Sequence, residues 1–230
     1  MPLRTTYELT DDCKPWFGFN LTWACHMLER LNLHVLSRDY RALLDVFKPW
    51  EEVSRVGTVP DHTVSSTPDS GFPPLPALSA SAAFVDPGFY DLTVRYKDTN
   101  GWAAVVPIAH PEYLLTDLGR RTFAVKCARW LQRGVNVVAI NACAPADLHG
   151  ELTALLGCRQ EMAWESPTGL SAVSYRVCRE KDRLRFDTWP FALRVGEELP
   201  TVPLWLEADR AVPLELESAF SGACKSLVLD

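Results

Sequence analysis

Residues 90–140 contain the feature that most constrains the fold. Two segments with strand patterns, residues 90–97 and 102–109, stand on either side of the sequence DTNG at residues 98–101. Asn-Gly is the strongest short signal for a hairpin, because both residues accept a positive φ. The sequence therefore predicts two antiparallel strands here, and the second of them carries Pro107, which has no backbone N–H to donate.

A helix and a buried strand are predicted to follow this hairpin. Residues 112–133 have apolar side chains at helical spacing, and Gly134 is a suitable residue to end the helix. Residues 135–140, VNVVAI, are β-branched and apolar, as in a buried central strand. A strand, a helix and a strand at this spacing predict a right-handed crossover between parallel neighbours.

The rest of the chain is consistent with one α/β domain covering residues 1–230. Residues 40–49 fit either a short helix or an edge strand, and residues 57–88 contain six prolines, with a short strand predicted at 61–64 and an irregular Pro-rich loop at about 65–88. The other predicted elements are helices at 14–32, 146–156 and 214–229, a hairpin of residues 170–178 and 184–193, and an extended segment at 199–206.

Composition and charge limit the classes of function. The net charge of −6 and the pI of about 5.4 are unlike those of a general nucleic-acid binder, although residues 120–133 hold a local basic cluster. The seven cysteines form no CxxC pair, which favours reduced thiols over a zinc site. We find no signal-peptide pattern and no membrane-spanning apolar run, so the sequence predicts a cytoplasmic protein without a membrane partner.

Several segments, in this order, resemble the restriction-endonuclease-like superfamily with the PD-(D/E)xK core. The resemblance is to its Uma-type branch and, most closely, to an uncharacterised bacterial family allied to that branch. The segments are WFGFNLTWACHMLERLNLHVLSRDYRALL, VPDHTV, TNGWAAVVPIAHP, FAVKCARWLQRGVNVVAI and LPTVPLWLEADRAVPLELESAF. The resemblance implies a mixed sheet flanked by helices, and it covers most of the chain.

The resemblance also implies a divalent-metal site. In such a site an aspartate and a glutamate hold Mg²⁺ or Mn²⁺, and a lysine stabilises charge at the phosphate. Carried over by position, the aspartate falls on Asp61, the lysine on Lys126 and the glutamate on Pro107. A proline has no side-chain oxygen, so the site implied by the family lacks its central ligand here.

Other residues offer alternatives to the missing glutamate. Asp91 is a second candidate carboxylate, and His110 and Glu112 could form a replacement site at the end of the second strand, where histidine suits Mn²⁺ better than Mg²⁺. Each also fits a structural reading: Asp61 as a turn residue, Asp91 as a solvent-facing strand residue, and Glu112 as a charge in the first turn of a helix.

We therefore expect a non-catalytic, degenerate nuclease-fold protein that acts as a binding, scaffold or accessory subunit, with a protein partner or a second copy and no cofactor. The alternative is an active Mg²⁺- or Mn²⁺-dependent nuclease with a rearranged metal site. Lys126 would be a relic in the first case and catalytic in the second. Nucleic acid is a further candidate partner, through the residues Arg120, Arg121, Arg129 and Arg133. Asp147 and His149 are candidates for two members of a hydrolase triad, but no GxSxG motif accompanies them.

Overall fold

The computed structural model describes residues 14–47, 89–180 and 183–227. Nearly all of them belong to one compact unit, Met1–Asp45 with Tyr90–Asp230. The second unit, Val46–Phe89, lies almost entirely outside the described residues. The strand predicted at 61–64 and the Pro-rich loop fall there, so the expectation of a single domain stays a prediction.

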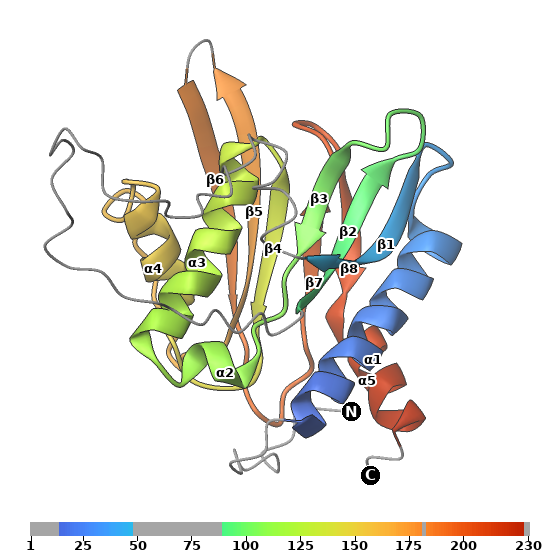
Figure 1. The fold of residues 1–230 in the computed structure, drawn as a ribbon, viewed down its shortest axis with the longest axis horizontal. Helices are drawn as coiled ribbons and strands as arrows, with labels where there is room; N and C mark the ends of the chain where they lie inside the picture. Colours follow the sequence, from blue (N-terminus) through green and yellow to red (C-terminus); the bar gives the residue numbers. More distant parts are fainter. Residues whose placement is uncertain (1–13, 48–88, 181–182, 228–230) are drawn as a thin grey trace, which may run out of the picture. The chain divides into compact units, whose positions relative to one another are not determined.

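A six-stranded mixed sheet in the order β1-β2-β3-β4-β5-β6 forms the centre of the described unit (Figure 1). The strands are β1 (Tyr40–Phe47), β2 (Phe89–Tyr96), β3 (Trp102–Val106), β4 (Asn136–Asn141), β5 (Ser171–Glu180) and β6 (Arg183–Ala192). Of the predicted segment 40–49, the described residues 40–47 form an edge strand and not a helix. The mixed α/β class predicted from the sequence is confirmed.

The predicted hairpin and crossover are both present. β2 and β3 pair antiparallel, and Asn100 takes a φ of +56° in the turn between them. β3 and β4 pair parallel, with Ala104 opposite Asn136, and Gly134 takes a φ of +81° just before β4. Local turn residues and β-branched strands therefore determine this part of the fold.

The crossover consists of two helices, which corrects the prediction of one helix at 112–133. α2 (Pro111–Leu114) ends before Thr116, and α3 (Asp117–Gln132) begins after it. Thr116 is extended, with φ −132° and ψ 151°, and its side chain accepts a hydrogen bond from the N–H of Gly119 at 3.0 Å. This N-cap satisfies a donor that would otherwise lack a partner at the start of α3, so the chain breaks there.

The two faces of the sheet are covered by different elements. On one face, Val138 and Ile140 of β4 join a core with α1 (Lys14–Arg30), α5 (Leu216–Ser226) and the strand β7 (Thr201–Trp205). Figure 1 shows α1 (blue) beside α5 (red), although they lie near opposite ends of the sequence. On the other face, Ala139 and Asn141 lie against α3 and α4 (Leu148–Leu155). The alternation along β4 is that expected of a strand buried on both faces.

The C-terminal segment differs from the prediction in one respect. Residues 214–229 were expected to be helical, but Leu214 and Glu215 belong to β8 (Ala211–Glu215), and α5 begins at Leu216. β8 pairs antiparallel with β7, placing Pro203 opposite Pro213. The side chain of Ser174 on β5 donates a hydrogen bond to the carbonyl of Pro203 at 2.6 Å, which ties this small sheet to the large one. Because β8 is stabilised by contacts with residues distant in the sequence, its own residues give little indication of a strand.

The β5–β6 hairpin contacts β7 through a stacked arginine. The Arg176 guanidinium lies 4.3 Å from the ring centroid of Trp205 and 5.4 Å from that of Trp189. It donates to Asp187 from Nε at 3.0 Å and from Nη2 at 2.5 Å. Because the guanidinium is planar, it can stack on the rings and hold the carboxylate at the same time.

This contact predicts a loss of stability in acid. Burial alone would raise the pKa of Asp187, but hydrogen bonds from Arg176 and Arg185 outweigh it and hold the pKa below its usual 3.8. The carboxylate therefore contributes stability above pH 3.8, and the contribution is lost as the pH falls through the folded-state pKa. At pH 7 we expect Asp187→Asn to lower the free energy of unfolding by about 1–2 kcal/mol.

Urea denaturation of the wild type and of Asp187→Asn between pH 7 and pH 3 checks this prediction. The difference between the two proteins should stay constant down to about pH 5 and shrink below about pH 4. A difference that grows as the pH falls would contradict the assignment.

Candidate functional site

Asp91 on β2 and Lys126 on α3 form a buried ion pair on the α3 side of the sheet. Lys126 Nζ lies 2.6 Å from Asp91 Oδ1, and the two side chains are 10% and 1% exposed. Asp91 is the only carboxylate among the described residues that is almost fully buried. Its second oxygen, Oδ2, has no hydrogen-bond partner among the described residues. The structure thus brings two of the predicted site residues together.

A row of polar side chains continues from Asp91 along the same strand. Thr93 and Arg95 follow at alternate positions, and both bond to Asp45 on the neighbouring strand β1. Thr93 Oγ1 donates to Asp45 Oδ2 at 2.6 Å, and Arg95 forms an ion pair with the same oxygen. The sequence prediction missed these three residues. For Thr93 and Arg95, the alternation of Asp, Thr and Arg in DLTVR was the available signal, since strand residues two apart share a face; Asp45 lies outside that segment.

Pro107 follows directly after the last residue of β3. The register of β2 and β3 ends with Leu92 opposite Val106. Asp91 and Pro107 are the next residues on either side of that pair. Pro107 is buried, and its carbonyl accepts a hydrogen bond from the N–H of Ile140 at 3.0 Å. The position where the resemblance places a metal-binding glutamate therefore lies one residue beyond the Leu92–Val106 pair, on the β3 side, as Asp91 does on the β2 side.

Among the other predicted metal ligands, only His110 has a side chain within the described residues. His110 is buried, but its ring packs against Phe17 of α1, with 6.5 Å between the ring centroids. Asp61 lies outside the described residues, and so does the side chain of Glu112. Within the described ranges, no three His, Cys, Asp or Glu side chains gather in a way that could hold a metal ion.

The four predicted nucleic-acid-binding arginines differ in their surroundings. Arg120 forms an ion pair with Asp117 and donates to the carbonyl of Leu114. Arg121 and Arg129 are exposed, and Arg133 is exposed with its guanidinium 5.9 Å from the ring centroid of Trp130. Three of the four therefore remain accessible to a ligand.

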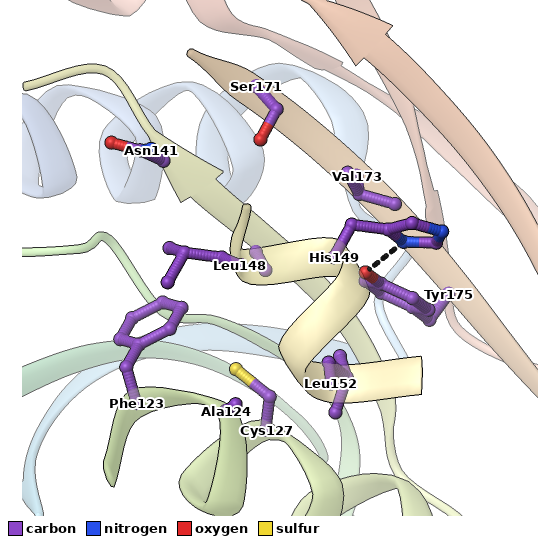
Figure 2. Close-up of a pocket in the computed structure, with 11 residues that line it drawn as sticks. Phe123, Ala124, Cys127, Asn141, Leu148, His149, Leu152, Ser171, Val173 and Tyr175 are labelled. Carbon is purple, nitrogen blue, oxygen red and sulfur yellow. Dashed lines mark hydrogen bonds between the residues drawn. The ribbon is translucent and has the colours of Figure 1, made fainter. Parts of the chain in front are cut away.

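A second group of buried polar residues surrounds a cavity between α3, α4 and the sheet (Figure 2). The cavity has a volume of about 10 Å³, which is room for one water molecule. His149 Nδ1 lies 2.8 Å from the hydroxyl of Tyr175, and Figure 2 shows these two side chains pointing toward each other. Burial raises the pKa of Tyr175 well above 10 and that of the Cys127 thiol to about 12. Both groups therefore stay protonated at neutral pH.

The hydrogen bonds of His149 assign its tautomer. Its Nε2 lies 2.7 Å from the carbonyl oxygen of Met162, which can only accept. In the neutral ring Nε2 therefore carries the proton, and Nδ1 accepts from Tyr175.

Asp147 does not face the His149 ring. It caps α4 by accepting from the N–H of Gly150, and it forms an ion pair with Arg159 at 3.5 Å. With both ring nitrogens bonded elsewhere, His149 lacks the arrangement of a hydrolase triad.

Comparison of the chain with protein-family models, with curated proteins and with solved structures gave no match. Among the described residues, no helix combines the length and the apolar character needed to cross a bilayer. The functional argument therefore depends on the chemistry of the sites themselves.

Proposed function

We propose that this chain is a restriction-endonuclease-like protein with a degenerate metal centre, and that it acts as a binding, scaffold or accessory subunit. Support for the fold comes from the order of the elements, in which a helix precedes β1, β2 and β3, and a crossover leads to the parallel strand β4. This order agrees with the resemblance of the sequence segments to that superfamily.

The observation that carries the proposal is the environment of Asp91. Its charge is neutralised by Lys126 at 2.6 Å, and Pro107, one residue beyond β3, has no carboxylate at the position where the resemblance implies a glutamate. A resident Mg²⁺ is normally held by more than one hard oxygen ligand, with water filling the remaining positions. One carboxylate already paired with a lysine fits such an ion poorly, so we derive no reaction step through a metal.

The exposed residues on the α3 side of the sheet suit the binding of a partner better than they suit catalysis. Trp102 is 36% exposed at the start of β3, and Arg121 and Arg129 are exposed on α3. Aromatic side chains and arginine are enriched where proteins bind one another. We propose a protein partner or a second copy of the chain, with nucleic acid as the other candidate.

The contact of Asp91 with Lys126 also favours a second candidate function, an active Mg²⁺- or Mn²⁺-dependent nuclease with a rearranged site. A buried carboxylate with one oxygen lacking a partner within the described residues, next to a lysine, is a plausible part of such a site. Asp61 or Glu112 would supply a further oxygen ligand, and Lys126 would stabilise negative charge on a phosphate.

A cleavage assay distinguishes the two candidates. Purified protein is incubated with labelled single- and double-stranded DNA and RNA, in Mg²⁺, in Mn²⁺ and in chelator. We expect no metal-dependent cleavage from the wild type, Asp91→Asn, Lys126→Met or Asp61→Ala. Cleavage that chelator abolishes, and that Asp91→Asn and Lys126→Met both lose, would establish the nuclease and overturn the non-catalytic proposal.

A further inference from the structure

We propose that Cys158 and Met162 form a binding site for a soft monovalent metal ion of the Cu(I) class. The site lies in the turn that follows α4, and the proposal does not depend on the function assigned to the Asp91 region.

The end of α4 fixes the position of Cys158. Gly157 takes a φ of +73°, which favours glycine, and its N–H donates to the carbonyl of Ala154. The N–H of Cys158 donates to the carbonyl of Thr153 at 3.0 Å. These two bonds are the pair found in a Schellman motif, which satisfies the last carbonyls of the helix. Cys158 is thus held by the helix end and not by a loose loop.

A second turn brings the sulfur of Met162 to that of Cys158. The N–H of Met162 donates to the carbonyl of Cys158 at 3.1 Å, and Cys158 Sγ lies 3.1 Å from Met162 Sδ. The buried ring of His149 bonds to the carbonyl of Met162 at 2.7 Å, so the far end of the turn is anchored as well. His149 is a positioning residue here, because its ring nitrogens are occupied by Met162 and Tyr175.

Two sulfur ligands select the class of metal. A thiolate and a thioether are soft donors, which Cu(I) prefers, whereas Mg²⁺ and Ca²⁺ prefer oxygen. Zinc usually takes four ligands from Cys, His, Asp and Glu, and no group of three such side chains gathers anywhere in the described residues. The pair therefore favours an ion that accepts few ligands and tolerates a thioether.

The geometry needs only a small adjustment. With metal–sulfur bonds of about 2.3 Å and a trigonal angle, two sulfurs stand about 4 Å apart, so they must separate by roughly 1 Å. The three rotatable bonds of a methionine side chain permit such a movement. Both side chains are partly exposed, so an ion can reach them.

Metal binding by Cys158 replaces a proton. The S–H bond breaks, the sulfur–metal bond forms, and one H⁺ is released per ion.

The test is a Cu(I) titration of the reduced, full-length protein without oxygen, in competition with a chromogenic Cu(I) chelator. Cys158→Ser removes the thiolate, Met162→Leu removes the thioether at nearly constant volume, and Cys25→Ser removes an exposed thiol on α1 as the matched control. We expect affinity to fall about 100-fold in Cys158→Ser and about 10-fold in Met162→Leu, and to stay unchanged in Cys25→Ser.

Three results would overturn the proposal. They are wild-type affinity in Cys158→Ser, wild-type affinity in Met162→Leu, and tighter binding of Zn²⁺ than of Cu(I) by the same residues. Thermal melting of each variant without metal shows whether that variant is still folded. Should Cys158→Ser unfold, the roughly tenfold lower affinity of a folded Met162→Leu, with one proton still released per Cu(I) bound, decides the question.

Discussion

Replacing Lys126 with methionine is expected to lower the free energy of unfolding by about 3–5 kcal/mol. Methionine is also unbranched and is one heavy atom shorter than lysine, and it carries neither the charge nor the donor that Asp91 uses. Asp91, which is 1% exposed, is then left as a buried carboxylate without its counterion. Urea denaturation at neutral pH measures the effect.

The double variant Lys126→Met with Asp91→Leu is the control. Replacing a buried ion pair by apolar residues of similar size is often neutral or stabilising, so the double variant should recover most of the loss. An effect below about 1 kcal/mol for Lys126→Met alone would be that of an exposed salt bridge and would contradict the buried pair.

The elements predicted correctly are those whose structure is determined by residues close together in the sequence. Asn100 and Gly101 gave the β2–β3 turn, and the VNVVAI segment gave β4, because turn chemistry and β-branched runs act over a few residues. β8 was missed because it depends on its partner β7, and the helical pattern of α5 continues into it. The break at Thr116 was missed because a side-chain cap competes with an otherwise continuous apolar stripe.

The sequence identified several residues of the candidate site, but it did not show which of them contact one another. Lys126 followed from the resemblance, and Asp91 was one of four metal-ligand candidates. Nothing local in the sequence joins residues 35 positions apart on β2 and α3. The bonds of Asp45 to Thr93 and Arg95 bridge two strands that are well separated in the chain, so they too needed the structure.

Restoring a carboxylate at Pro107 is expected to create a Mn²⁺ site. Pro107→Glu places a glutamate just after β3, at the position where the resemblance implies a metal-binding glutamate. Asp91, the second candidate carboxylate, precedes Leu92, which pairs with Val106. Without metal, a second buried carboxylate should destabilise the protein, because burying an unpaired charge costs several kcal/mol. When Mn²⁺ binds, both carboxylates act as its ligands and their charge is neutralised, so stability should return.

Linkage gives the size of the recovery. At a Mn²⁺ concentration ten times the Kd, binding adds about 1.4 kcal/mol, which raises the Tm of a protein of this length by about 3–6 °C. Pro107→Gln is the matched control, because it has the shape of glutamate without the charge. It should show no dependence of Tm on Mn²⁺, and neither should the wild type.

The Tm of Pro107→Glu as a function of Mn²⁺ concentration therefore tests the central proposal, that this region is a degenerate metal centre in which Pro107 stands where a metal-binding glutamate is implied and Asp91 is a remaining carboxylate. A rise of several degrees in Pro107→Glu, absent from Pro107→Gln and abolished by adding Asp91→Asn, is the result we predict. A folded Pro107→Glu protein whose Tm does not respond to Mn²⁺ would contradict the claim.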